Sequence, residues 1–358
     1  MDSQRMAAIP SADDQFSSYR CPRTGVSLER EGHYLRSTGG EYEYEVREGI
    51  PCFLRYQSVD QGWSEDELGR LTAAASRRGW RDAVIEIYGD NSDMLRYVDS
   101  KERESFLSLL PIDETSNVLE VGIGFGQFTV PLARRAKHVH ALEVRFQQAI
   151  FADIRCQQEG VSNLSIACGG DDCRLPYPDA SMDLVVLNLV FEWCGSRLLD
   201  DPGEAGQRIL LREVARVLKP GGTMYLATKN RFALRLLLGG PDEHAHEMPF
   251  GFALPAWIMH PLLKLRGHDQ PGGTLHSYPK LKSMIHESGM RTTESFWPLP
   301  EMRFPRAYVP TGTDDIREAR NTLEPPLGEN RRTSLALSFV PSAVVKFVSP
   351  GLVFLAVK

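Results

Sequence analysis

Between residues 117 and 229, short apolar runs alternate with stretches of helical periodicity. Five of the runs have the β-branched, apolar composition of strands buried in a parallel sheet: NVLEV, HVHALEV, LSIAC, MDLVVLNLV and TMYLATK. The clearest helical stretch runs from Ile209 to Leu218 and is followed by a Pro-Gly-Gly turn. This alternation predicts an α/β protein built on a doubly wound, mostly parallel sheet.

The pattern changes on both sides of this core. Residues 1–16 are small and polar and predict a disordered tail, whereas residues 17–56 hold strand-like pieces typical of a small β-rich module. Residues 57–98 are charged and predict a helical linker. The main domain is expected over 99–358, and its segment 231–276, rich in Gly, Pro and His, predicts an insert after the fifth strand that covers a substrate.

Three further segments carry local signals. Asp99 with Glu102 three residues later predicts the capping box of a helix that ends at Pro111. The apolar stretch 334–347 is expected to pack on the sheet, because its basic content is too small for membrane anchoring. The closing GLVFLAVK predicts a last strand.

Composition and charge are those of an ordinary globular protein. The chain has 358 residues, of which 42% are hydrophobic and 25% charged, with a net charge of -6 that disfavours a dedicated nucleic-acid binder. Six scattered cysteines without a CxxC pair predict reduced thiols in a cytoplasmic protein. The N-terminal stretch lacks the apolar core of a signal peptide and no run of 18 apolar residues occurs, so no membrane span is expected.

A glycine-rich turn follows the first predicted strand, in NVLEVGIGFGQFTV. Its glycines are Gly122, Gly124 and Gly126. A dinucleotide-binding turn has the spacing G-x-G-x-x-G, and its third glycine would stand where this chain has Gln127. The spacing G-x-G-x-G, with Glu120 two residues ahead, resembles motif I of the class I S-adenosylmethionine-dependent methyltransferases. A turn of this kind lets the backbone pass flat against a ligand.

Later segments resemble further motifs of the same family in the same order. CGGDDCRLPYPDASMDLVVLNLV is similar to the family pattern G-D-x-x-x-L-P-F-x-D-x-S-F-D-x-V, and LREVARVLKPGGTMYLATKN is similar to its next helix, turn and strand. The resemblance covers about residues 100–230, together with the closing FLAVK. It implies the family's seven-stranded sheet, whose last strand is antiparallel, and S-adenosylmethionine as the cofactor.

The resemblance also implies roles for individual residues. Glu143 lies 21 residues beyond the first glycine, where the family has an acidic residue that accepts the ribose hydroxyls, and Val144 stands beside it. Asp171 corresponds to the residue that accepts the adenine amino group, and the backbone of Asp172 would face the ring edge. Asn188 is expected near the transferred methyl group. Glu120 and the three glycines complete the expected cofactor site.

The N-terminal module resembles the zinc-ribbon-like module that precedes some methyltransferases. Cys21-Pro22 and Gly49-Ile50-Pro51 are kept, but the other positions of the ligand pattern read Thr24, Ser37 and Gly40. A structural zinc site needs four nitrogen or sulfur ligands. We therefore expect a ribbon fold without a metal.

The segment after the fourth strand constrains the acceptor atom. Amide N-methyltransferases of DNA and proteins carry an Asp/Asn-Pro-Pro-aromatic motif there, whereas this chain has Asn188-Leu-Val-Phe-Glu192-Trp193. The missing prolines argue against amide and exocyclic base N-methylation and leave oxygen, carbon or a small amine. Glu192 and Trp193 either face the substrate or pack at the start of a helix.

Candidate bases cluster in the predicted insert and just beyond it. Six histidines fall within 43 residues: His244, His246, His260, His268, His276 and His286. Histidine is the usual general base near neutral pH, and we favour His244 or His246, with His276 third. Metal assistance through His244-x-His246 and the glutamates around them stays open, as does a solvated polar loop, so no residue is assigned as a metal ligand.

The C-terminal third bears a looser resemblance to methyltransferases of glycan, lipopolysaccharide and natural-product assembly, in TKNRF, HSYPKL and WPLPEMRFPRAYVP. It implies a polar, sugar-type acceptor, with Arg303 and Arg306 binding a carboxylate or phosphate or else forming surface ion pairs. The leading hypothesis is O-methylation of a small natural-product or glycan acceptor. The alternatives are an RNA methyltransferase and a non-catalytic cofactor-binding scaffold, and the oligomeric state is open, a homodimer included.

Overall fold

The computed structural model describes residues 16–56, 63–90, 92–196 and 203–358. The predicted tail therefore lies outside the described residues except for Phe16, as does the start of the predicted linker.

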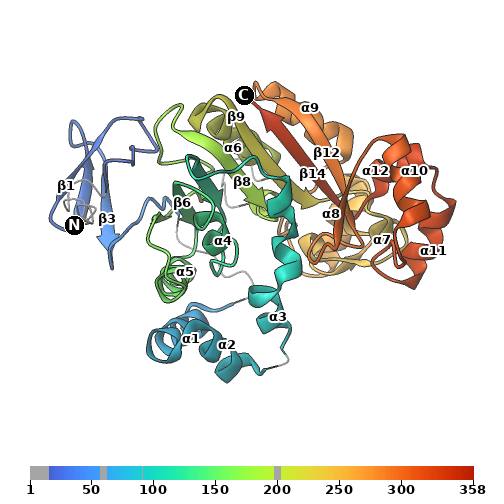
Figure 1. Cartoon of the computed structure of the whole chain (residues 1–358), viewed down its shortest axis with the longest axis horizontal. Coiled ribbons are helices and arrows are strands. Elements are labelled where there is room, and N and C mark those ends of the chain that lie inside the picture. The colour runs from blue at the N-terminus through green and yellow to red at the C-terminus, as the bar shows by residue number, and fades with distance from the viewer. Residues whose placement is uncertain (1–15, 57–62, 91, 197–202) are drawn as a thin grey trace, which may run out of the picture.

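One large mixed sheet forms the centre of the molecule (Figure 1). Its strands, in the spatial order β13-β12-β14-β9-β8-β5-β6-β7, are β13 (Ala307–Pro310), β12 (Arg291–Leu299), β14 (Gly351–Val357), β9 (Leu218–Lys229), β8 (Met182–Asn188), β5 (Asn117–Val121), β6 (His138–Glu143) and β7 (Leu164–Cys168). Strands β5 to β9 are parallel, and β14 runs antiparallel between β9 and β12. The predicted α/β architecture is confirmed. The sheet has eight strands where seven were expected, because β13 pairs with β12 at its edge.

Helices cover both faces of this sheet. On one face α6 (Glu204–Val217) and α9 (Tyr278–Glu287) bury Leu210 and Leu281 against strand residues such as Leu187. On the other face α4 (Thr129–Ala133) and the 3-10 helix η2 (Lys101–Leu109) pack around Phe106 and Val186. Parallel strands covered on both faces have continuous apolar runs, which is why the sequence revealed them.

Three helices fill the predicted linker and reach into the main domain: α1 (Glu65–Arg78), α2 (Trp80–Tyr88) and α3 (Asp93–Asp99). The prediction that a helix begins at Asp99 is wrong, because α3 ends at this residue and the 3-10 helix η2 follows it. The Oγ of Ser92 caps α3 instead, accepting a hydrogen bond from the backbone N–H of Leu95 at 3.1 Å. Helix α1 packs on α5 (Phe146–Gln158), which follows β6.

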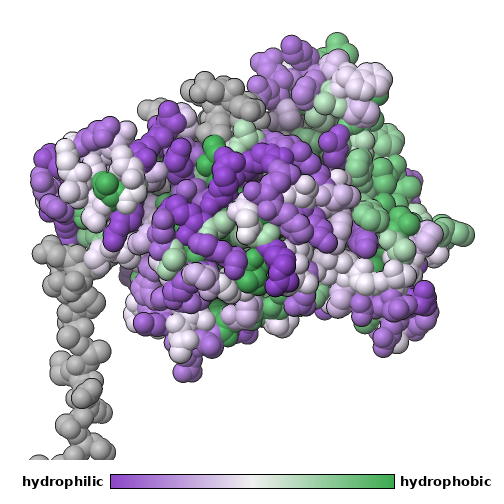
Figure 2. Space-filling model, turned by 90° about the horizontal axis from the view of Figure 1, so that it is seen from above, coloured by the Kyte–Doolittle hydropathy of each residue, from purple (hydrophilic) through white to green (hydrophobic). Residues whose placement is uncertain are grey.

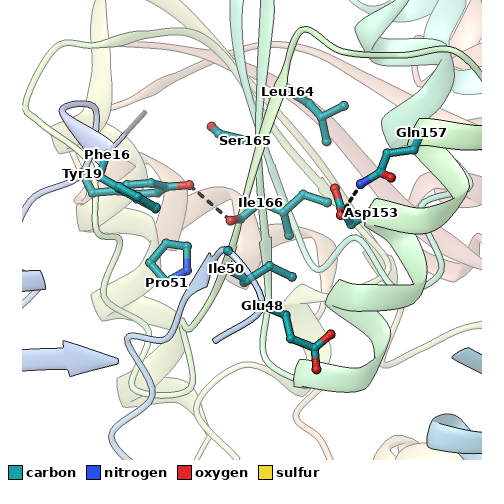
Figure 3. Close-up of a pocket in the computed structure, with 11 residues that line it drawn as sticks. Phe16, Tyr19, Glu48, Ile50, Pro51, Asp153, Gln157, Leu164, Ser165 and Ile166 are labelled. Atoms are coloured by element: carbon teal, nitrogen blue, oxygen red, sulfur yellow. Dashed lines mark hydrogen bonds between the residues drawn. The ribbon is translucent and has the colours of Figure 1, made fainter. Parts of the chain in front are cut away.

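The N-terminal module is a four-stranded antiparallel sheet of β1 (Leu28–Glu31), β2 (Tyr34–Ser37), β3 (Glu43–Arg47) and β4 (Ile50–Pro51). It is joined to the edge strand β7, where the backbone N–H of Phe53 donates to the carbonyl of Cys168 at 2.7 Å. A cavity of about 210 Å³ lies in this seam between the module, β7 and α5 (Figure 3). The Sγ of Cys21 lies 3.2 Å from the hydroxyl of Tyr44. The zinc-ribbon resemblance stays a prediction.

The predicted insert contains α7 (Leu234–Leu237), β10 (Pro241–Asp242), η4 (Glu243–Ala245), β11 (Met248–Pro249), η5 (Gly251–Ala253) and α8 (Ala256–Leu265). Farther along the chain, α10 (Thr313–Thr322), α11 (Arg331–Phe339) and α12 (Ser342–Val348) cover the β12–β13 edge. The stretch 334–347 packs on the sheet through Leu337 and Val345, as expected, but several of its other apolar side chains are exposed. In the described part of the chain, no helix combines the length and apolar character that crossing a bilayer requires.

Candidate functional site

The glycine turn lies between β5 and α4, and all three of its glycines have left-handed backbone conformations. The φ angles of Gly122, Gly124 and Gly126 are 76°, 55° and 71°. A Cβ at Gly122 would stand 2.4 Å from the Cγ2 of Val190, and one at Gly126 would stand 3.1 Å from a side chain of α5. At Gly124 only the amide of Gln127, 3.7 Å away, would come within 4 Å. Packing therefore closes the turn at both ends and leaves it open at its middle glycine.

The carboxylate of Glu143 lies against this open glycine. Its Oε2 accepts a hydrogen bond from the backbone N–H of Gly124 at 2.8 Å, and its Oε1 accepts from Val144 and Arg145 at 2.8 and 3.1 Å. Burial raises the pKa of Glu143, and the three backbone hydrogen bonds oppose that rise. A carboxylate has about four acceptor positions, so capacity remains for the hydroxyl of a ligand. The turn and Glu143 thus fit the ribose end of S-adenosylmethionine.

Glu120 occupies a different place from the one expected. Its side chain is buried between β5 and α4, where the hydroxyl of Thr129 donates to its Oε2 at 2.7 Å. Burial raises the pKa of Glu120 to about 8. The structure shows that this residue ties β5 to α4, and its part in the cofactor site stays a prediction.

The two aspartates at the expected adenine end hold the N-terminal module. The carboxylate of Asp171 accepts the backbone N–H groups of Arg55, at 3.0 and 3.2 Å, and of Tyr56, at 2.6 Å. Asp172 forms an ion pair with Arg23 at 3.3 Å, and burial raises its pKa. The motif could not reveal these partners, because they come from a separate module. An adenine-binding role for Asp171 would have to share its oxygens with these donors and stays a prediction.

The carboxyl ends of β8 and β9 form the neighbouring part of the site. Asn188 ends β8, and Val190, which packs on Gly122, leads into the 3-10 helix η3 (Phe191–Trp193). Within η3, Glu192 is buried, and its Oε2 accepts a hydrogen bond from the hydroxyl of Thr228 in β9 at 2.7 Å. Burial raises the pKa of Glu192. Glu192 therefore lies two residues beyond the Val190 that packs on the glycine turn, and its contact with the substrate stays a prediction.

His244 of η4 meets this cluster from the insert. Its Nδ1 lies 3.1 Å from the Oδ1 of Asp242, and its ring packs on that of Trp193 with centroids 4.6 Å apart. Its Nε2 is buried and has no hydrogen-bond partner among the described residues. This nitrogen lies 4.0 Å from the Oε1 of Glu192 and 4.0 Å from the Oε1 of Glu243. A buried imidazole thus keeps one nitrogen free between two carboxyl groups.

Asp242 was not singled out in the sequence, although it stands two residues before His244 in P-D-E-H. Besides the ring nitrogen, it accepts the backbone N–H groups of His244 at 3.0 Å and of Phe252 at 2.9 Å. Burial opposes ionisation of Asp242, but these hydrogen bonds outweigh it and lower its pKa. An ionised carboxylate that fixes a histidine ring is the usual arrangement of a general base.

The other two candidate bases are bound elsewhere. The Nε2 of His246 donates to the carbonyl of Gln270 at 2.9 Å, and its ring stacks on His268 at 3.7 Å. The Nε2 of His276 donates to the Oε1 of Gln207 at 2.6 Å, and burial lowers its pKa to about 4. The structure therefore does not bring these histidines together with His244. Within the described residues, it also shows no group of three or more side chains that could hold a metal.

A charged cavity of about 270 Å³ lies at the end of β9, and Glu243, the residue before His244, lines it. It is lined by Lys229, Arg235, Pro241, Glu243, Glu247, Glu301, Arg303 and Glu329. Arg303 forms an ion pair with Glu243 at 2.8 Å, and Arg235 pairs with Glu329 at 3.0 Å. In the part of the chain that the structure describes, Lys229 has no ion-pair partner. Lys229, which was not predicted, is therefore the cation of this cavity that remains available to a ligand.

Arg303 and Arg306, which were predicted together, differ in their positions relative to this cavity. Arg303 lines the cavity but is already neutralised by Glu243. Arg306 is not among the lining residues, and its guanidinium donates to the carbonyl of Pro326 at 2.9 Å. Arg303 is therefore already paired and Arg306 lies outside the cavity, and their binding of a carboxylate or phosphate stays a prediction.

Comparisons with known proteins agree with this geometry. Residues 119–226 match a family model described as methyltransferase domain. The bifunctional biotin-biosynthesis protein BioHC of Cellvibrio japonicus is 34% identical over 54% of this chain and 36% of its own length. The malonyl-[acyl-carrier protein] O-methyltransferase of a Marinomonas species is 34% identical over 41% and 49%. The demethylmenaquinone methyltransferase of Deinococcus radiodurans is 37% identical over 45% and 54%.

The matched region coincides with the strands and turns that form the glycine turn, Glu143, Asp171 and the end of β8. The chain spans from about a third to about half the length of these curated relatives. The closing strand β14 runs antiparallel beside β9, as the resemblance of FLAVK implied. The chain therefore carries a class I S-adenosylmethionine-dependent methyltransferase domain.

Proposed function

We propose that this protein transfers the methyl group of S-adenosylmethionine to an oxygen atom of a small, polar acceptor. The observation that carries the proposal is the Asp242–His244 pair, whose free Nε2 is buried at the carboxyl ends of β8 and β9. Open α/β sheets bind their ligands at that edge. The malonyl-[acyl-carrier protein] O-methyltransferase among the relatives supports oxygen as the acceptor atom. The natural-product or glycan identity of the acceptor stays a prediction.

The turn residues hold the cofactor in this proposal. Glu143 accepts ribose hydroxyls while the open backbone at Gly124 lets the ligand approach closely. When bound, the cofactor supplies a methyl group on a sulfonium that is already a good leaving group. The work left to the protein is alignment, exclusion of water and removal of a proton from the acceptor.

His244 is the residue placed to take that proton. Asp242 accepts its Nδ1–H, so the imidazole keeps Nε2 unprotonated, with the carboxyl groups of Glu192 and Glu243 4.0 Å away. A hydroxyl of the acceptor that reached this nitrogen would transfer its proton there, and the Asp242 carboxylate would stabilise the charged ring. General-base catalysis of this kind contributes about 10²–10⁴ in rate.

Lys229 is the cation that a polar group of the acceptor would meet in the cavity, whose lining carries four glutamates and three cations. It stands at the end of β9, and its charge acts on the buried Glu192 and the half-buried Glu243. Burial raises the pKa of Glu192. Burial also opposes ionisation of Glu243, but Lys229, Arg303 and His244 outweigh it and lower the pKa of Glu243. A carboxylate or phosphate entering the cavity would meet Lys229 as its cation. The two arginines that line the cavity are already paired.

Methyl-label transfer tests the proposal. Purified protein is incubated with methyl-labelled S-adenosylmethionine and a panel of hydroxy acids and sugar phosphates, and the labelled product is treated with mild alkali. A hydroxyl acceptor gives an alkali-stable methyl ether, and His244→Asn is expected to reduce its formation by about 10²–10⁴. His246→Asn, a change in the histidine that donates to Gln270, is the matched control and should keep full activity.

Two outcomes would contradict parts of the proposal. An alkali-labile product that releases labelled methanol, formed equally well by His244→Asn, would identify a carboxyl acceptor that needs no base. Transfer to RNA alone, with steep salt dependence, would favour the RNA methyltransferase alternative.

A further inference from the structure

One end of the molecule exposes large apolar side chains on two helices. On α8, Trp257 is 77% and Leu265 84% exposed, and on α11, Leu335 is 65% and Phe339 80% exposed. Figure 2 shows hydrophobic residues gathered at the end of the molecule where Figure 1 places α7, α8 and α10 to α12, with hydrophilic residues around them. Exposed apolar surface rimmed by polar residues marks an interaction site in a folded protein.

Helix α8 is apolar on two faces. Its inner face buries Met259 and Leu263 in a cluster with Phe252 of η5, and its outer face presents Trp257 and Leu265 to solvent. A helix that is hydrophobic all round is normally enclosed on all sides. The outer face of α8 therefore lacks an apolar neighbour within the described residues.

Helices α8 and α11 belong to one continuous surface. Helix α11 contacts α7, and both α7 and α8 contact the intervening η5. The exposed residues Leu237 and Leu238, at the end of α7, and Phe250, just before η5, lie between them. We refer to the outward side chains of α7, α8 and α11 with Phe250 as the apolar end.

Charge at the apolar end has a single sign along the two segments that form most of it. Between Glu247 and the exposed Asp269, residues 248–268 contain no Asp or Glu, and their charged side chains are Lys264 and Arg266, both exposed. Residues 330–358 also contain no Asp or Glu, and they include Arg331 and Arg332 at the start of α11. The chain as a whole has a net charge of -6, so this local excess of cations runs against its composition.

We propose that the apolar end docks on the surface of an anionic lipid bilayer. Apolar side chains that include a tryptophan, flanked by Lys and Arg, form the pattern of a helix that lies in the membrane interface. Tryptophan is enriched at this depth because its ring is apolar and its N–H is polar. The complementary sign of Lys264, Arg266 and the two arginines of α11 favours anionic lipid as the occupant.

The stretch 334–347 by itself carries too little basic charge for membrane binding. The fold, however, adds α8 with its two cations to the same surface. Acidic residues do lie on the neighbouring α10, at Asp314, Asp315 and Glu318, beside Arg317. Docking therefore requires that α8 and α11, and not α10, face the lipid.

Co-sedimentation with vesicles tests the proposal without any methyl acceptor. Sucrose-loaded vesicles of phosphatidylglycerol and phosphatidylcholine in equal parts are expected to sediment the protein, and pure phosphatidylcholine vesicles to sediment much less. Trp257→Ser with Leu265→Ser should lower the partition coefficient by more than about tenfold. Tyr34→Ser, a change in a side chain 40% exposed on the N-terminal module, is the control that should bind as the unchanged protein does.

Charge reversal and fluorescence give independent readouts. Lys264→Glu with Arg266→Glu should lower partitioning to anionic vesicles by at least about fivefold for each residue. Arg135→Glu with Lys137→Glu, in the exposed turn before β6, is the matched charge control. Vesicles should shift the tryptophan emission of the protein to shorter wavelength, and Trp257→Phe should keep sedimentation but lose most of that shift.

Other occupants predict other results. Absence of sedimentation with anionic vesicles, or sedimentation that both double variants retain, would overturn the proposal. A dimer in light scattering that Trp257→Ser with Leu265→Ser converts to monomer, together with no vesicle binding, would assign the apolar end to a second copy of the chain. An unchanged unfolding midpoint shows that each variant is folded.

Discussion

Replacement of Glu143 by glutamine separates two effects of this buried carboxylate: its effect on the stability of the fold and its effect on the affinity for the cofactor. In the folded chain the carboxylate accepts three backbone hydrogen bonds, from Gly124, Val144 and Arg145, and only 5% of the residue is exposed. Glutamine has the same shape but only one oxygen. It can keep the pair from Val144 and Arg145, and its NH₂ group then faces the N–H of Gly124.

Two effects on stability oppose one another. Loss of a hydrogen bond to a charged group costs about 1.5–3 kcal/mol. Burial, however, raises the pKa of Glu143, so the ionised form is disfavoured in the folded state and glutamine removes that penalty. A raised pKa contributes stability below the unfolded value of about 4.3 that is lost as the pH rises through the folded pKa. We therefore expect Glu143→Gln to change the free energy of unfolding at pH 7 by less than about 1 kcal/mol.

Cofactor binding should respond differently. A ligand hydroxyl that meets an NH₂ group instead of a carboxylate oxygen leaves a polar group unpaired, at a cost of about 1–3 kcal/mol, or roughly 5- to 150-fold in affinity. Urea unfolding and calorimetric titration with S-adenosylmethionine measure the two quantities on the same sample. Glu114→Gln, on an exposed turn, is the control. A folded Glu143→Gln protein with undiminished affinity would refute the assignment of Glu143 to the ribose.

Three other substitutions test the surrounding structure. Because the pKa of Glu120 is raised to about 8, the stability it contributes below about pH 4.3 is lost as the pH rises through 8. Urea unfolding at pH 5, 7 and 9 should therefore show a free energy of unfolding that depends less on pH for Glu120→Gln than for the unchanged protein. An unchanged dependence would contradict the buried carboxyl group. Gly122→Ala combines a φ of 76° with overlap of the new methyl group onto Val190, so it should cost about 2–4 kcal/mol of stability. Adding Val190→Ala to the same chain should restore part of that loss. Absence of any recovery would rule out the overlap. Asp242→Asn leaves His244 and Phe252 with a single acceptor oxygen, so it should destabilise the fold by about 1.5–3 kcal/mol. It should also lower the rate of methyl transfer at unchanged cofactor affinity. Equal rates of transfer by the variant and the unchanged protein would show that His244 is not the base.

The sequence was most informative where structure depends on local pattern. The parallel strands were recognisable because both faces are covered, and the glycine turn because its left-handed residues tolerate only glycine without strain. The same spacing pointed to Glu143, which the fold brings against Gly124. Both inferences used residues within one βαβ unit.

Contacts between segments far apart in the chain could not be predicted from local sequence patterns. The sequence around Asp171 does not indicate that the backbone N–H groups of residues 55 and 56 donate to its carboxylate, because these contacts depend on how the N-terminal module packs on the main domain. Of the three candidate histidines, the fold places His244 beside Glu192, because the irregular insert decides where each ring points. The exposure of α8 and α11 on one surface is also a property of packing, which periodicity within each segment does not reveal.

Calorimetric titration of the purified protein with S-adenosylmethionine and S-adenosylhomocysteine tests the central claim most directly. We expect one site per chain with a dissociation constant in the range of about 1 μM to 1 mM that is usual for enzyme ligands. Gly124→Val fills the open middle of the turn and strains a backbone with a φ of 55°, so its unfolding midpoint is measured with the titration, and the folded variant should give no binding heat. Absence of binding to the unchanged protein, or full affinity in Gly124→Val, would contradict the assignment of this turn to the cofactor.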